Sequence, residues 1–217
     1  LWDIAGKAAG LPVYRLLGGK IRDYVRPYGR SADTPEKFTI VKVNVGINTR
    51  ISDSIPNLFY GTPQEQAVMH KVTPNPYGFD PSTNSYRSKT APRPNRGVIT
   101  EKGMEALVRA VEERKKELGK EIGMAIECGT GFALSDAIKF AKAVESYNPI
   151  WLEDLITGDY HPYVQADLYK KLTDSTNCPI HTGEQIYLRE NFKELIENKA
   201  VRVLGPDPAD MGGIAEL

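Results

Sequence analysis

Four acidic residues recur at regular intervals in the second half of the chain, each at the end of a short apolar run. They are Glu127, Glu153, Glu184 and Asp207, and successive members lie 26, 31 and 23 residues apart. Carboxylates that converge in a partly buried site repel one another and require a cation. Oxygen ligands suit a hard metal such as Mg²⁺, and the sequence has no Cys or His cluster with the spacing of a zinc site. The pattern therefore predicts a carboxylate metal site.

A lysine and an amide share one face of an earlier apolar segment. In "VKVNVGIN", residues 41–48, the period-two alternation of a strand places Lys42 and Asn44 on the same side, opposite the valines. A lysine next to a divalent cation is a candidate base or electrostatic stabiliser. An amide has no useful basicity at neutral pH. The segment therefore predicts a strand that carries site residues on one face.

An alternation of short strands and helices would position these residues. Strands are predicted at 24–31, 39–46, 123–129, 149–155, 179–185 and 201–207. Helices are predicted at 1–17, 100–118, 134–147, 163–176 and 188–199. Strands that are each followed by a helix are typical of parallel βα units.

Six consecutive βα units are compatible with a doubly wound sheet or with part of a (β/α)₈ barrel. In a barrel, the C-terminal ends of successive strands converge on one mouth, whereas in an open sheet they form a row. Repeated acids at strand ends favour convergence. The predicted fold is therefore α/β, a (β/α)₈ TIM barrel that is incomplete here and contains about strands 1–6.

A long polar segment, residues 47–98, interrupts this pattern and is rich in Pro, Asn, Ser, Thr and Tyr. Inserts of this length are uncommon inside compact domains. It could cover the mouth and bind a polyhydroxylated substrate, or it could form a subunit contact. Because the chain lacks an initiator Met and starts within a predicted helix, we expect it to be a piece of a longer protein.

Composition excludes several classes of partner. The 217 residues are 41% hydrophobic, and 28 Lys and Arg balance 28 Asp and Glu. Binding to nucleic acid or to a membrane surface needs a basic excess that this chain lacks. The two cysteines form neither a CxxC pair nor a disulfide framework, and no apolar run is long enough to span a membrane. We expect a cytoplasmic protein.

Several motifs resemble those of the enolase superfamily, and within it the mandelate racemase subgroup. "LWDIAGKAAGLPVYRLLGGK" is similar to the helix that ends the capping domain, which implies a boundary between residues 1–20 and a barrel domain at 21–217. "WLED", "PIHTGE" and "VLGPDPADMGGIAEL" resemble the segments around the fourth, fifth and sixth barrel strands. Apart from the insert at 47–98, the likeness covers nearly the whole chain.

The resemblance implies a function for each acid. Glu127, Glu153 and Glu184 would bind Mg²⁺, and Asp207 would orient a catalytic histidine on a strand beyond Leu217. Family chemistry is removal of the proton α to a carboxylate, which gives a metal-held enediolate that is either reprotonated or loses a β-hydroxyl group.

The same resemblance gives Lys42 the place of a lysine beside the substrate carboxylate. Asn44 stands where a second lysine would be one of two bases, so two-base racemisation is not expected. Glu127 departs from the Asp that is more usual in the subgroup, and Gly129 replaces a polar residue. We predict a hydro-lyase that dehydrates a sugar acid and is a homo-oligomer at full length. The alternatives are a racemase or epimerase of the same family, or a binding or sensing relative without catalysis.

Two histidines and a cysteine complete the candidates. His161, near Asp159, could reach the mouth and bind substrate. His181 precedes Glu184 by three residues, so alternation predicts that it points to the opposite face, between barrel and helices. Cys128 is expected to serve in packing.

Overall fold

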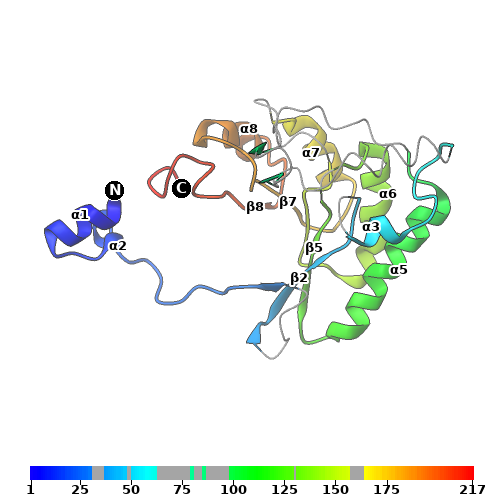
Figure 1. Cartoon of the computed structure of the whole chain (residues 1–217), viewed down its shortest axis with the longest axis horizontal. Coiled ribbons are helices and arrows are strands. Elements are labelled where there is room, and N and C mark those ends of the chain that lie inside the picture. Colours follow the sequence, from blue (N-terminus) through cyan, green and yellow to red (C-terminus); the bar gives the residue numbers. More distant parts are fainter. Residues whose placement is uncertain are drawn as a thin grey trace.

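The computed structural model describes residues 1–30, 37–47, 50–62, 79–80, 85–86, 98–129, 131–156 and 164–217. Six parallel strands make the main sheet (Figure 1). They are β1 (Gly29–Arg30), β2 (Ile40–Asn44), β5 (Gly123–Glu127), β6 (Trp151–Glu153), β7 (Ile180–Thr182) and β8 (Val203–Leu204). Each lies within the segment predicted for it and is shorter than that segment.

The order of the strands distinguishes between the two predicted architectures. Neighbours in the sheet run β1-β2-β5-β6-β7-β8, which is the order of the chain, and every pair is parallel. A doubly wound sheet reverses direction at a switch point, whereas the wall of a (β/α)₈ barrel does not. The incomplete barrel is therefore confirmed.

Helices connect the strands and cover the outer face of the sheet (Figure 1). They are α5 (Glu101–Leu118), α6 (Leu134–Val144), α7 (Ala166–Asp174) and α8 (Lys193–Glu197), with short 3₁₀ turns at Glu145–Tyr147 and Arg189–Phe192. The N-terminus of α5 is capped by Thr100, whose hydroxyl accepts a hydrogen bond from the backbone N–H of Gly103 at 2.9 Å. No helix in the described ranges is long and apolar enough to cross a bilayer.

The hydrophobic core lies between this helical layer and the sheet. On β2, the side chains of Val41 and Val43 are buried, and Lys42 and Asn44 alternate with them on the other face. Leu107 of α5 and Phe140 of α6 are completely buried in the same core. The alternation of β2 thus packs its valines against the helices and leaves the lysine and the amide on the inner face of the barrel wall.

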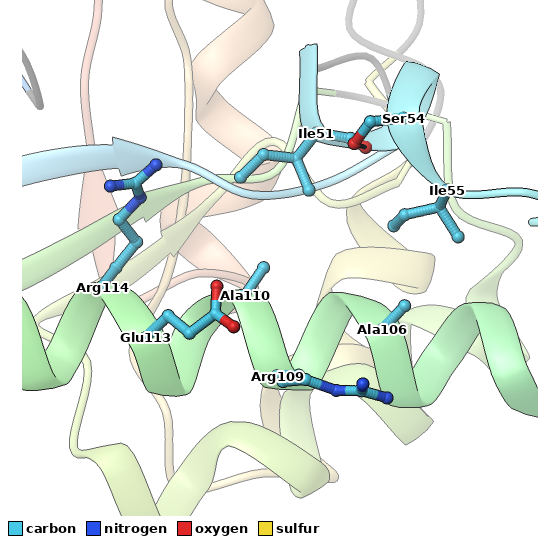
Figure 2. A pocket seen from close by; sticks show the side chains of 8 residues that line it. All are labelled: Ile51, Ser54, Ile55, Ala106, Arg109, Ala110, Glu113 and Arg114. Carbon is cyan, nitrogen blue, oxygen red and sulfur yellow. Dashed lines mark hydrogen bonds between the residues drawn. The ribbon is translucent and has the colours of Figure 1, made fainter.

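The segment at 47–98 contains more regular structure than predicted. Helix α3 (Arg50–Ser54) packs beside α5, and a two-stranded antiparallel sheet pairs β3 (Phe79–Asp80) with β4 (Ser85–Tyr86). Leu58 and Phe59 are buried, and Phe59 bridges to Ile99. This regular structure forms because the apolar residues at the start of the segment pack into the hydrophobic core. A pocket of about 270 Å³ separates α3 from α5 (Figure 2).

The N-terminal residues form two short helices, α1 (Trp2–Ala9) and α2 (Val13–Leu16). Gly10, with a φ of 65°, ends α1, so the single helix predicted at 1–17 is divided in two. The pair stands apart from the sheet at the end of an extended connection (Figure 1). The side chains of Leu1, Ile4 and Ile21 are exposed.

Candidate metal centre

Three glutamates meet at the C-terminal ends of neighbouring strands. Glu127 is the last residue of β5, Glu153 is the last residue of β6 and in register with it, and Glu184 follows β7 by two residues. One carboxylate oxygen from each glutamate lies within 4.8 Å of the others. The parallel register therefore brings together residues that are far apart in the sequence.

The donor set fits a hard divalent cation. Two oxygens bound to one Mg²⁺ at about 2.1 Å lie at most about 4.2 Å apart, so the observed spread needs only small side-chain movements. Three carboxylates, one of them buried and one partly buried, supply the negative charge that such an ion requires. Glu127, Glu153 and Glu184 are therefore the residues that could hold a metal here.

The pKa values of two of these glutamates move in opposite directions. Burial, together with the charge of Glu153, raises the pKa of Glu127 to about 7. Burial also raises the pKa of Glu153, but His181, Lys42 and Trp151 outweigh it and leave that pKa below its ordinary value. Near neutral pH, Glu153 is ionised and Glu127 is divided between its two protonation states.

Lys42 is the cation of the cluster among the described residues. Its Nζ donates to Oε1 of Glu153 at 2.7 Å and to Oε2 of Glu127 at 3.1 Å, and it lies 5.5 Å from the centre of the Tyr28 ring. Burial lowers the pKa of Lys42, but the two glutamates raise it well above the ordinary value. Asn44, two residues further along β2, is in register with Glu127. Lys42 is therefore a fixed positive charge beside the glutamates.

His181 lies on the inner face, and the prediction that it points toward the helices was wrong. It is in register with Glu153, and its Nδ1 lies 3.5 Å from Oε2 of that glutamate. The same oxygen accepts a hydrogen bond from Nε1 of Trp151 at 2.8 Å. Alternation fails because Gly183, with a φ of 139°, interrupts the strand between His181 and Glu184. The sequence "TG" just before Glu184 could have indicated that the alternation is interrupted there.

A buried hydrogen-bonded network on the other face of these strands was also missed. The hydroxyl of Thr182 donates to Oδ1 of Asp154 at 2.7 Å, and the Tyr169 hydroxyl lies 3.0 Å from the Thr182 oxygen. Asp154 is only 2% exposed and has a φ of 50°. The network joins the ends of β6 and β7 to α7, directly behind Glu153 and Glu184.

The remaining predicted site residues have other surroundings. Asp207 lies in the turn after β8, where its Oδ1 accepts a hydrogen bond from the backbone N–H of Ala209 at 2.7 Å. Its role toward a histidine stays a prediction. His161 and Asp159 lie outside the described residues. Cys128 is completely buried, as expected for a packing residue, and burial raises the pKa of its thiol.

Comparison with known families gives a match over most of the chain. The family described as "Enolase C-terminal domain-like" matches residues 31–217. That range includes five of the six strands of the main sheet and the three glutamates, and β1 lies just before it.

Curated relatives are named as dehydratases of sugar acids. The chain is 26% identical over 217 residues to a D-galactonate dehydratase of Verminephrobacter eiseniae, and it covers 47% of that protein. It is 28% identical over 216 residues to a D-xylonate dehydratase of Haloferax volcanii and covers 46% of it. The chain thus spans about half the length of these relatives.

A solved structure supports the same fold. The mandelate racemase/muconate lactonizing enzyme-like protein from Rubrobacter xylanophilus is 30% identical and superposes with a TM-score of 0.66. The match covers 99% of this chain and 51% of that protein.

Proposed function

Because the chain belongs to the enolase C-terminal domain-like family, we propose that it is the catalytic part of a metal-dependent dehydratase that acts on a sugar acid. The observation that carries the proposal is the convergence of Glu127, Glu153 and Glu184 around one point, with Lys42 beside them. A bound metal ion and the positive charge of Lys42 would both attract a substrate carboxylate to this point.

We propose Mg²⁺ as the ion and the three glutamates as its protein ligands. When bound, such an ion would stabilise the negative charge that develops on the substrate carboxylate as the α proton leaves. Glu153 is ionised before the ion arrives, whereas Glu127 has to release a proton over part of the neutral range. Binding of the ion would therefore displace a proton from Glu127 but not from Glu153.

Lys42 would neutralise the substrate carboxylate from β2, because its ammonium group stays charged in this environment. Asn44, next along the same face, cannot remove a proton at neutral pH. A single base would therefore act from the other side of the substrate, first taking the α proton and then protonating the leaving β-hydroxyl group. We propose that this base is a histidine outside the 217 residues and that Asp207 orients it.

The remaining assignments follow from the same resemblance. Residues 1–20 would be the end of an N-terminal capping domain, and residues 21–217 would be part of the barrel domain. His161 would contact substrate, and the complete protein would be a cytoplasmic homo-oligomer. The exposed apolar residues of α1 support the first assignment, since a capping domain would cover them.

The first test is the reaction itself. The complete polypeptide that the gene encodes is incubated with Mg²⁺ in D₂O and a panel of sugar acids, and products are identified by mass spectrometry. We expect loss of water from one acid, and no loss with Glu184→Gln, which removes one metal ligand.

Other outcomes identify the alternatives. Deuterium uptake without loss of water would replace the dehydratase by an epimerase. The absence of exchange into any acid would favour a non-catalytic binding relative. Asn44 would then mark a site that has no base on β2. Activity that survives in Glu184→Gln would contradict the assigned metal centre.

A further inference from the structure

Glu153 is the most constrained member of the three glutamates. Its side chain is 2% exposed, and both oxygens face donors. Oε1 accepts from Lys42 at 2.7 Å, whereas Oε2 accepts from the indole Nε1 of Trp151 at 2.8 Å and faces Nδ1 of His181 at 3.5 Å. A carboxylate with its rotation fixed in this way presents its free lone pairs in a defined direction.

His181 is held in a narrow slot. Its ring lies 5.5 Å from the Trp151 ring at an angle of 31°. On the other side is the backbone of Gly205, where a methyl group would come within 2.1 Å of Nε2. Glycine at 205 therefore leaves the space that the imidazole occupies.

The surroundings of His181 indicate a role at the metal centre. His181 is 8% exposed, and its Nδ1 is a buried polar atom without a hydrogen-bond partner in the described structure. Leaving such an atom unpaired destabilises the folded state. Oε2 of Glu153 is an acceptor 3.5 Å from Nδ1, and a shift of about 0.5 Å would bring the two atoms to ordinary hydrogen-bond distance. A packing residue could have been apolar at this position.

We propose that Trp151 and His181 are positioning residues that clamp Oε2 of Glu153 with two N–H donors and so set its direction toward the metal. The inference deepens the proposed function and rests on it. His181 acts as its Nδ1–H tautomer, and neither residue is a metal ligand. Trp151 lies two residues before Glu153 on the same face of β6, and His181 is opposite Glu153 on β7, so the clamp is built into the register of the sheet.

The test is metal affinity, measured by calorimetric titration of Mn²⁺ into the complete polypeptide. Trp151→Phe keeps the aromatic ring but removes the indole N–H. His181→Leu keeps most of the volume but removes both nitrogens, whereas His181→Asn keeps an N–H donor near the position of Nδ1. Loss of an orienting partner typically weakens metal binding by about 10–100-fold. We expect weakening in this range for Trp151→Phe and His181→Leu, and affinity close to wild type for His181→Asn.

A packing role predicts the opposite order. Leucine would then preserve both metal affinity and thermal stability, and asparagine would lower stability without a specific effect on metal. That result, or an unchanged affinity in Trp151→Phe and His181→Leu, would overturn the proposal. Melting temperatures measured without metal show whether each variant folds, and Trp151→Phe provides a second readout if His181→Leu does not.

The wild-type protein and Glu184→Gln separate this proposal from the proposed function. If the wild type does not bind Mn²⁺, or binds it as well as Glu184→Gln does, the metal centre itself is wrong. If the wild type binds and Glu184→Gln does not, the titrations of the Trp151 and His181 variants test the clamp alone.

Discussion

At the scale of single residues, the charge of Glu127 would control how readily the proposed metal centre accepts a cation. Because its pKa is about 7, a proton would compete with the metal for Glu127 as the pH falls through neutrality. In the metal-free protein the same raised pKa contributes stability that is complete below the unfolded value, near 4.5, and is lost as the pH rises through 7. A bound cation would reverse that loss.

We therefore predict that Mn²⁺ affinity falls as the pH drops from 8 to 6, by up to about tenfold per pH unit below 7 for one displaced proton. Calorimetry in buffers of different ionisation enthalpy should show little proton release at pH 8.5 and nearly one proton at pH 6. A release that does not depend on pH would contradict the assignment of Glu127.

Lys42 gives a second prediction at this scale. Lys42→Met keeps the length of the side chain but removes its charge, which otherwise repels an incoming cation. We expect metal affinity to stay the same or increase, while turnover of the sugar acid falls by at least about 100-fold because substrate loses its counter-charge. Titration and kinetics on the same sample separate the two effects. If metal affinity and turnover fell together, Lys42 would have a structural role instead.

At the scale of elements, the network behind the glutamates keeps β6 and β7 together. Thr182→Val removes the hydroxyl between Asp154 and Tyr169 without changing volume. We expect a loss of about 1–3 kcal/mol in the free energy of unfolding, because a buried carboxylate loses a donor. Thr173→Val is the matched control, since its hydroxyl donates to the backbone carbonyl of Ala200 and to no carboxylate among the described residues. Urea unfolding should show the larger loss for Thr182→Val.

The elements also show which features a sequence can predict. The alternation in 39–46 correctly predicted that the valines are buried and that Lys42 and Asn44 share the other face, and the rhythm after residue 100 predicted the parallel strands. Both are local patterns.

The features that escaped prediction depend on backbone geometry or on pairing between strands. His181 was misplaced because one glycine with a positive φ broke the period of two. The bond from Thr182 to Asp154 depends on the register of two strands. Helix α3 was not predicted because the average composition of residues 47–98 is polar, although apolar residues are concentrated at the start of that segment.

At the scale of the whole molecule, β1 and β8 each have a neighbour on one side only in the described sheet. An unpaired edge leaves backbone N–H and C=O groups without partners and favours association. We predict that a polypeptide limited to residues 1–217 shows no cooperative thermal transition and tends to aggregate, whereas the complete polypeptide melts cooperatively. Scanning calorimetry of both at equal concentration is the measurement. A sharp, reversible transition for residues 1–217 would contradict the prediction.

The strand order has a further consequence, for the time course of folding. Each of the three glutamates belongs to a different βα unit, so no local hairpin or single helix can bring two of them together. Contacts between distant parts of a chain form late, because loop closure must precede them. The proposed three-glutamate site would therefore be absent from a chain in which these strands have not yet paired. Capture of the metal would mark the moment at which the third of these strands joins its neighbours.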